Sequence, residues 1–135
     1  MTPSRAVFDA SVVVRAVVDR SPAAVDWVRR AEAGEVEAVV PDLVFAECAH
    51  ALLRYVRGLA VEPRIALEKI EVVTALRLDV RPLRPLVGAA FAVAVQRRLS
   101  LYDGCYLALA EAEQAVLVTA DRRLAAAATR AELVA

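Results

Sequence analysis

Short apolar runs of the kind that are buried in a sheet alternate with helical stretches along this chain. The clearest runs, residues 6–8 and 115–119, are bounded by polar residues, as strands buried on both faces are. Weaker strand signals lie at residues 37–40, 78–83 and 132–134, and helices are predicted at 11–18, 22–33, 42–57, 63–78, 85–99, 102–114 and directly after Asp121. Strands separated by helices favour parallel pairing through right-handed crossovers. We therefore predict an α/β fold, a three-layer sandwich with a short, mostly parallel sheet flanked by helices.

Length and composition indicate one packed domain over residues 1–135. The content of 59% hydrophobic and 25% charged residues excludes a disordered chain. No apolar run approaches the roughly 18 residues of a membrane-spanning helix, and residues 1–5 do not lead into a signal-peptide core. Two cysteines, Cys48 and Cys105, provide no disulfide framework. We expect a cytoplasmic protein without a membrane partner.

The charge is balanced, with 17 basic and 17 acidic residues, so no overall field attracts a polyanion. Any nucleic acid must be bound locally. The apolar character of residues 12–18 and 86–95 exceeds what one buried helical stripe requires, which indicates helices that also cover a second copy of the chain. The alternative is that small alanines inflate the apolar count without forming an adhesive surface.

Two acids follow the two clearest strands. Asp9 stands directly after residues 6–8, and Asp121 comes two positions after Thr119. Ligands of open α/β sheets bind outside the carboxyl ends of the strands, so both are site candidates. Each is equally able to cap the helix that follows. Ser11 and Thr119 place hydroxyl groups beside the same two strand ends.

Two further acids lie in predicted helices. Glu47 is surrounded by apolar residues, although its spacing with His50 and Arg54 also fits a solvated helical stripe. Asp103 follows Ser100 in S-x-x-D spacing, which fits a capping box, and precedes Gly104, where a small residue would let backbone or substrate come close.

Each acid alone has a structural explanation, but four acids that lie close together would indicate a binding site. Clustered carboxylates repel one another unless a cation neutralises them, and a set of oxygen ligands without histidine or cysteine suits Mg²⁺ or Mn²⁺. Such a site activates water for attack on a phosphodiester and requires no nucleophilic side chain.

The segments FDAS, PDLVFAECAHAL, LSLYDGCYLALA and LVTADRRL, in this order, resemble a PIN-domain ribonuclease, specifically the VapC-type toxins of bacterial and archaeal toxin–antitoxin pairs. The resemblance implies that Asp9, Glu47 and Asp103 bind the metal, with Asp121 as the fourth acid and Ser11 and Thr119 as supporting polar residues. It also implies an Mg²⁺- or Mn²⁺-dependent endoribonuclease that forms homodimers and is neutralised by an antitoxin. As a hypothesis, arginines beside the acids line the RNA path; they are Arg97, Arg98, Arg122 and Arg123.

Other functional classes compete with the metal-dependent nuclease. A silent PIN-like binding or scaffold module remains open, whereas a receiver-like phospho-acceptor domain is disfavoured because Asp9 has no acidic neighbour and Lys69 lies in a helix. A dehalogenase-like phosphatase would need a second Asp where the chain has Ser11. Thiol catalysis through Cys48 or Cys105 is disfavoured by their apolar helical surroundings, and zinc binding by the absence of ligand spacing.

Overall fold

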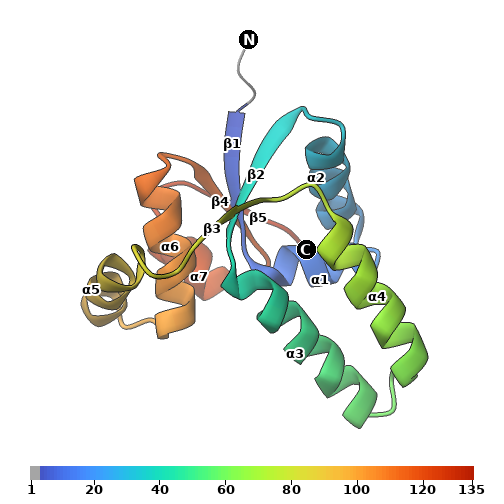
Figure 1. Cartoon of the computed structure of the whole chain (residues 1–135). Coiled ribbons are helices and arrows are strands. Elements are labelled where there is room, and N and C mark those ends of the chain that lie inside the picture. Colours follow the sequence, from blue (N-terminus) through green and yellow to red (C-terminus); the bar gives the residue numbers. More distant parts are fainter. Residues whose placement is uncertain (1–3) are drawn as a thin grey trace.

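A computed structural model describes residues 4–135 and shows a five-stranded sheet with helices on both faces (Figure 1). The strands are β1 (Ser4–Phe8), β2 (Val36–Pro41), β3 (Asp79–Arg81), β4 (Val116–Thr119) and β5 (Ala131–Leu133). The helices are α1 (Ala10–Val17), α2 (Pro22–Glu32), α3 (Leu43–Arg57), α4 (Pro63–Ala75), α5 (Val87–Arg97), α6 (Leu101–Ala112) and α7 (Arg122–Ala127). All strand pairs are parallel, in the order β3-β2-β1-β4-β5. The predicted α/β sandwich is therefore confirmed.

Strand β1 lies at the centre of the sheet. Its Val7 pairs with Val39 of β2 on one side and with Leu117 of β4 on the other, and all three side chains are fully buried. Strands covered on both faces need continuous apolar sequence, which is why these runs were the clearest strand signals. The chain order moves outward from β1 to β2 and β3, then returns to β4, so the carboxyl ends of β1 and β4 lie side by side.

The helices form two outer layers. Figure 1 shows α1, α2, α3 and α4 on one side of the sheet and α5 and α6 on the other. Helices α3 and α4 form a hairpin, while α5 packs closely along α6. Both α3 and the beginning of α6 lie at the end of the sheet where β1 stops, which is the lower end in Figure 1. This arrangement brings the predicted acidic segments to one end of the molecule.

All predicted boundaries except the end of α4 agree with the structure to within two residues, and the largest differences have local causes. The helix predicted to reach residue 78 ends at Ala75, because Leu76 has an extended conformation with ψ of 149°. The strand predicted at 78–83 covers only Asp79–Arg81, since Pro82 has no N–H to donate to the sheet. The helix predicted from residue 85 begins at Val87, after a turn in which the Leu86 and Val87 amides both donate to the Leu83 carbonyl.

The expectation that residues 12–18 cover a partner is wrong for most of that stretch. Five residues of α1 are buried within the single chain, namely Val12, Val13, Val14, Ala16 and Val17. Helix α1 needs apolar residues around most of its circumference because α2, α3 and the sheet all pack against it. Helix α5 differs, since only Ala90 of its residues is buried.

Within residues 4–135, no helix is both long and apolar enough to cross a membrane. The first three residues, part of the stretch predicted not to form a signal peptide, lie outside the described residues.

Candidate active site

Asp9 ends β1 and begins α1, and its carboxylate is held by four donors. Oδ1 accepts from the Ser11 amide at 3.0 Å, from the Ser11 hydroxyl, and from the Val12 amide at 3.4 Å, while Oδ2 accepts from the Thr119 hydroxyl at 2.7 Å. Asp9 is thus the N-cap of α1, as the capping interpretation predicted. It is also buried, with 6% of its surface exposed, which capping alone does not require.

The two hydroxyl groups link Asp9 to the next strand end. The Ser11 hydroxyl accepts from the Ala120 amide at 2.9 Å, and the Thr119 hydroxyl accepts from the Asp121 amide at 3.0 Å. Each hydroxyl therefore accepts from the backbone after β4 and donates to Asp9. Their supporting role remains a prediction, but both side chains occupy positions that fix the Asp9 carboxylate.

Burial raises the pKa of Asp9 to about 6, even though the bonds from Ser11, Thr119 and the backbone lower it. A carboxylate removed from water loses solvation that hydrogen bonds only partly replace. Asp9 is therefore an acid whose charged form lacks full compensation from the protein.

Glu47 projects from α3 and meets a buried tyrosine of α6. The Tyr106 hydroxyl donates to Glu47 Oε1 at 2.6 Å, and Tyr106 is 2% exposed. Burial and the Glu47 charge keep the pKa of Tyr106 far above its usual range, so the phenol remains a donor. The pKa of Glu47 is raised by burial and by the Asp103 charge, against the lowering effect of the Tyr106 bond. Tyr106 thus fixes one oxygen of Glu47 and leaves the other oxygen available.

Asp103 lies in the first turn of α6, and its amide donates to the Ser100 hydroxyl at 3.0 Å. The predicted Ser100 cap is thereby confirmed. The pKa of the half-buried Asp103 carboxyl is raised by burial and by the Asp121 charge, with a lowering contribution from Arg123. A Cβ atom at Gly104 would stand 2.5 Å from the Ala90 carbonyl oxygen, so this glycine allows the backbone of α5 to approach closely.

Asp121 is exposed and caps α7 by accepting from the Arg123 amide at 2.9 Å and the Leu124 amide at 3.3 Å. Both oxygens of Asp9 are occupied by donors, whereas only one oxygen of Asp121 is used by this cap.

The structure places the four acids at the same end of the sheet, and three of them are close enough for their charges to interact. The charge of Asp103 acts on Glu47, and that of Asp121 acts on Asp103. In the part of the chain that is described, however, no three carboxylate, imidazole or thiol groups gather closely enough to form a ready metal-binding set.

The donor chemistry nevertheless fits a hard cation such as Mg²⁺, which binds proteins through one or two carboxylates and keeps several waters. Three of the acids have raised pKa values because their negative charge is poorly compensated, and a cation would supply that compensation.

The arginines predicted to line an RNA path have different surroundings. Arg97 donates to the Ala127 carbonyl at 2.7 Å and pairs with Glu111 at 2.8 Å, and Arg123 donates to the Arg98 carbonyl at 2.7 Å. These bonds join helices, so Arg97 and Arg123 have structural roles whatever else they do. Arg122 is exposed and lines a shallow hollow together with Arg15.

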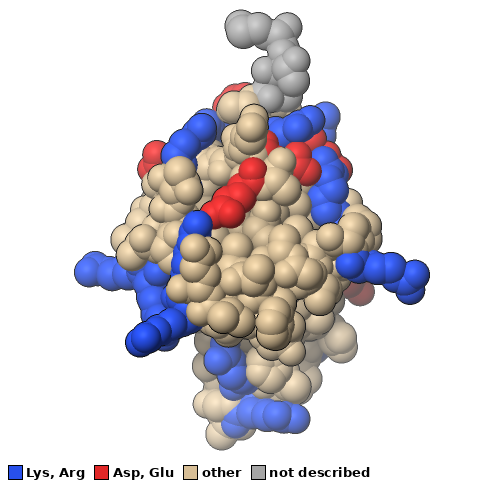
Figure 2. Space-filling model, turned by 90° about the vertical axis from the view of Figure 1, so that its left-hand side faces the viewer, with Lys and Arg blue, Asp and Glu red and all other residues tan. Residues whose placement is uncertain are grey.

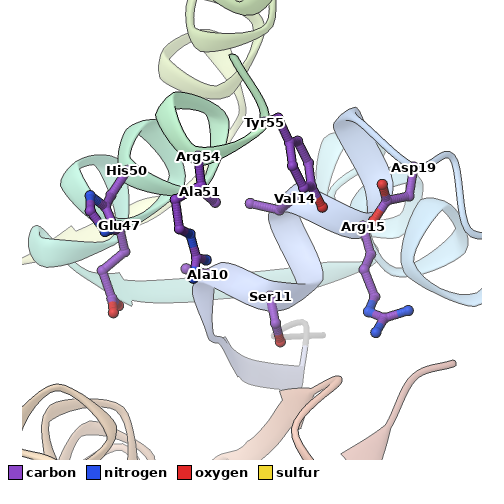
Figure 3. A pocket seen from close by; sticks show the side chains of 10 residues that line it. All are labelled: Ala10, Ser11, Val14, Arg15, Asp19, Glu47, His50, Ala51, Arg54 and Tyr55. Atoms are coloured by element: carbon purple, nitrogen blue, oxygen red, sulfur yellow. The ribbon is translucent and has the colours of Figure 1, made fainter. Parts of the chain in front are cut away.

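A cavity of about 460 Å³ opens beside the acids, between α1 and α3. Figure 3 shows the Arg54 side chain reaching from α3 toward Ala10, the carboxylate of Glu47 and the hydroxyl of Ser11 both pointing down in this view, and Arg15 on the other side of Ser11. Its lining comprises Ala10, Ser11, Val14, Arg15, Asp19, Glu47, His50, Ala51, Arg54 and Tyr55.

Two features of this region were not identified from the sequence. Tyr106 is three residues after Asp103, so the helical period predicts that both side chains lie on one face of α6. Its hydrogen bond to Glu47 could not be predicted in this way, because the two residues are 59 positions apart. Arg54 and His50 were assigned to a solvated stripe with Glu47, whereas the whole stripe lines the cavity.

The sequence matches the PIN domain family over residues 6–130, which is nearly the whole chain. The chain belongs to the PIN domain family. No curated protein is similar enough in sequence to match.

Solved structures share the fold of this PIN domain. It is similar to PAE2754 from Pyrobaculum aerophilum, with a TM-score of 0.79 and 27% identity over 98% of this chain and 92% of the other. VapBC2 from Rickettsia felis, solved with a DNA fragment from its promoter, has a TM-score of 0.71 and 15% identity over 97% and 99% of the two chains. A toxin–antitoxin complex from Klebsiella pneumoniae has a TM-score of 0.64 and 16% identity over 94% and 95%.

Proposed function

We propose that this PIN domain is a metal-dependent endoribonuclease that hydrolyses RNA phosphodiester bonds. The observation that carries the proposal is the placement of Asp9, Glu47, Asp103 and Asp121 at one end of the sheet. Burial raises the pKa of Asp9, and burial together with the charge of a neighbouring acid raises the pKa of Glu47 and of Asp103. Family membership supports the same reaction class. The buried thiols do not offer an alternative, because burial raises the pKa of Cys48 to about 12 and also raises that of Cys105.

In this proposal Asp9, Glu47 and Asp103 hold one Mg²⁺ or Mn²⁺ ion, and Asp121 holds a water or a second ion. When bound, the metal activates water and stabilises charge on the leaving oxygen. Ser11 and Thr119 fix the orientation of Asp9, and Tyr106 fixes that of Glu47. Carboxylates fixed in this way would hold the metal in place, and the reaction would need no covalent intermediate.

We further propose that the chain is the toxin of a toxin–antitoxin pair, acts in the cytoplasm, and is neutralised by a cognate antitoxin. Structures of a toxin–antitoxin complex and of VapBC2 share its fold, which supports this assignment.

A homodimer is also proposed, with α5 as the contact. Figure 2 faces α5 and α6 and shows a broad area between the charged side chains that carries few charges.

Cleavage of labelled RNA in Mg²⁺, Mn²⁺ or EDTA tests the central proposal. We expect the wild-type chain to cut RNA only with metal, and both Asp9→Asn and Asp103→Asn to lose this activity while keeping native circular dichroism spectra. Asp26→Asn is the matched control, because Asp26 lies on α2 and pairs with Arg29 on the surface.

Cleavage that survives both active-site substitutions would contradict the proposal. Metal binding that depends on Asp9 and Asp103, without cleavage of any RNA tested, would favour a silent binding module.

A further inference from the structure

We propose that the cavity between α1 and α3 is a subsite for one nucleotide of single-stranded RNA, in which Arg15 and Arg54 bind the backbone phosphates on either side of Ser11. The inference rests on the proposed nuclease function and deepens it by naming the residues that guide the substrate to the acids. It assigns Tyr55 as the surface on which the base stacks.

The position of the cavity supports a substrate site. Glu47, one of the proposed metal-binding acids, belongs to its lining, and so does Ser11, which donates to a second acid, Asp9. Its volume of about 460 Å³ lies within the usual range for small-ligand sites, about 300 to 1,000 Å³. A concave space of this size suits a single nucleotide, and unpaired bases are the ones that side chains can stack on.

The two arginines come from different helices and lie on different sides of the cavity. Figure 3 shows the Arg54 side chain descending from α3 toward Ala10, and Arg15 extending from α1 beyond Ser11. Both residues are exposed. A strand passing from one guanidinium to the other therefore crosses Ser11, next to Asp9.

Arg15 and Arg54 differ from several other arginines because no carboxylate in the described part of the chain pairs with them. Arg5, Arg81 and Arg97 are occupied by carboxylates. Within residues 4–135, the guanidinium groups of Arg15 and Arg54 make no ion pair or hydrogen bond, although Asp19 and Glu47 line the same cavity. Their donors are free for the planar, bidentate binding that phosphate oxygens favour.

The acids alone would repel the phosphates of a substrate, so the site needs cations close by. Arg15 and Arg54 supply them, and Arg15 also lines the neighbouring hollow with Arg122. The positive charge thus continues past the cavity toward the end of β4. Phosphate contacts of this kind position a strand without reading its sequence.

Tyr55 adds a surface for the base. It is half-buried, and Figure 3 shows its ring beside Val14, between the two arginines. Stacking on an aromatic side chain is the common way in which proteins hold unpaired bases, and it requires no particular base.

The test is equilibrium binding of a short, fluorescein-labelled single-stranded RNA of mixed sequence, measured by anisotropy in EDTA at several salt concentrations. Each phosphate contact of a single strand contributes about 0.7 to the slope of log affinity against log salt. We expect Arg15→Gln and Arg54→Gln each to weaken binding and to reduce the slope by about 0.7, and the double variant by about 1.4. Arg57→Gln is the matched control, since Arg57 is also exposed on α3 but lies outside the cavity lining.

Tyr55 is tested by a pair of variants. Tyr55→Phe keeps the ring and should keep wild-type affinity, whereas Tyr55→Ala should weaken binding without changing the salt slope. Thermal unfolding of each variant verifies that the change in binding occurs in a folded protein.

Unchanged slopes in both arginine variants, or an equal change in Arg57→Gln, would overturn the subsite. Absence of salt-dependent RNA binding by the wild-type chain would overturn it as well. The nuclease proposal is tested independently of the subsite. Metal-dependent cleavage with unchanged salt slopes in the arginine variants would support the nuclease and contradict the subsite. Reduced slopes without any cleavage would support RNA binding in the cavity and contradict the nuclease.

Discussion

Asp9 shows how one residue combines a structural and a chemical requirement. As an N-cap it accepts from the first amides of α1, which many exposed aspartates do equally well. Its burial beneath Thr119 and Ser11 adds a cost, because the charged carboxylate is removed from water. The metal site proposed for Asp9 would give this buried charge a function and would offset part of its cost.

This cost predicts a stability that falls as pH rises. The folded pKa of Asp9 is about 6 and its ordinary value is 3.8, so the folded state binds the proton more tightly than the unfolded chain. Neutral Asp9 therefore favours folding below about pH 4, and this contribution is lost as pH rises through about 6. Its size is at most about 3 kcal/mol, from roughly two pKa units.

Chemical denaturation in EDTA measures this effect. At about pH 8, Asp9→Asn should be more stable than the wild-type chain by about 1 to 2 kcal/mol, after allowing for one lost acceptor. The difference should shrink toward about pH 4, and adding Mg²⁺ at the higher pH should stabilise the wild-type chain more than the variant. A wild-type chain that stays the more stable one at about pH 8 in EDTA would show that burial of the charge is not costly.

At the scale of elements, the tight packing of α5 on α6 determines where Asp103 lies. Gly104 follows Asp103 directly, and its lack of a side chain permits the Ala90 carbonyl to contact the α6 backbone. The sequence identified Gly104 as a residue that would allow a close approach. It gave no means of deciding whether helix or substrate would approach, because the partner lies on another helix.

Gly104→Ala should destabilise the protein by about 1 to 3 kcal/mol through overpacking, since the new Cβ would meet a backbone oxygen that cannot move independently. This loss exceeds the gain in helix propensity, up to about 1 kcal/mol. Gly88→Ala in α5 is the control, because its Cβ would have no atom within 4 Å. Equal stability changes in the two variants, measured by urea denaturation, would contradict a special contact at Gly104.

The positions of strands and helices could be predicted where nearby residues alone determine them. The continuous apolar runs of β1 and β4 and the Ser100 cap of α6 are examples. The end of α4 was predicted too late, since Leu76 and Leu78 are apolar but lie in the segment that leads to β3, where Leu76 is already extended. The Tyr106–Glu47 bond was not predictable, because it depends on how α3 and α6 meet across the end of the sheet.

At the scale of the whole molecule, the two faces of the sheet differ in how completely they are covered. Helices α1 to α4 form one layer, in which α1 is almost fully enclosed. On the other side, α5 is the outermost helix and keeps three large apolar side chains exposed: Val87 at 42%, Phe91 at 63% and Val95 at 66%. Their spacing of four residues aligns them in one stripe along α5. Leu101 and Tyr102 of α6 are exposed as well.

This stripe predicts the oligomeric state. A second copy of the chain would cover α5 across a two-fold axis, where Phe91 would lie near the centre and contribute most because it is large and aromatic. We expect the wild-type chain to sediment as a dimer at micromolar concentration and Phe91→Glu to sediment as a folded monomer. Leu67→Glu is the matched control, since Leu67 is 62% exposed but lies on α4, in the opposite layer.

The sedimentation experiment also distinguishes two explanations for the many apolar residues at 86–95, namely their alanine content and a dimer contact. If alanines alone account for it, the wild-type chain and both variants will sediment as monomers, and the exposed stripe has no partner of its own kind. If α5 is the contact, only Phe91→Glu dissociates the dimer, and its thermal midpoint becomes independent of protein concentration. Asp103 lies on α6, which packs on α5, so dimerisation would also stabilise the helix pair that positions this acid.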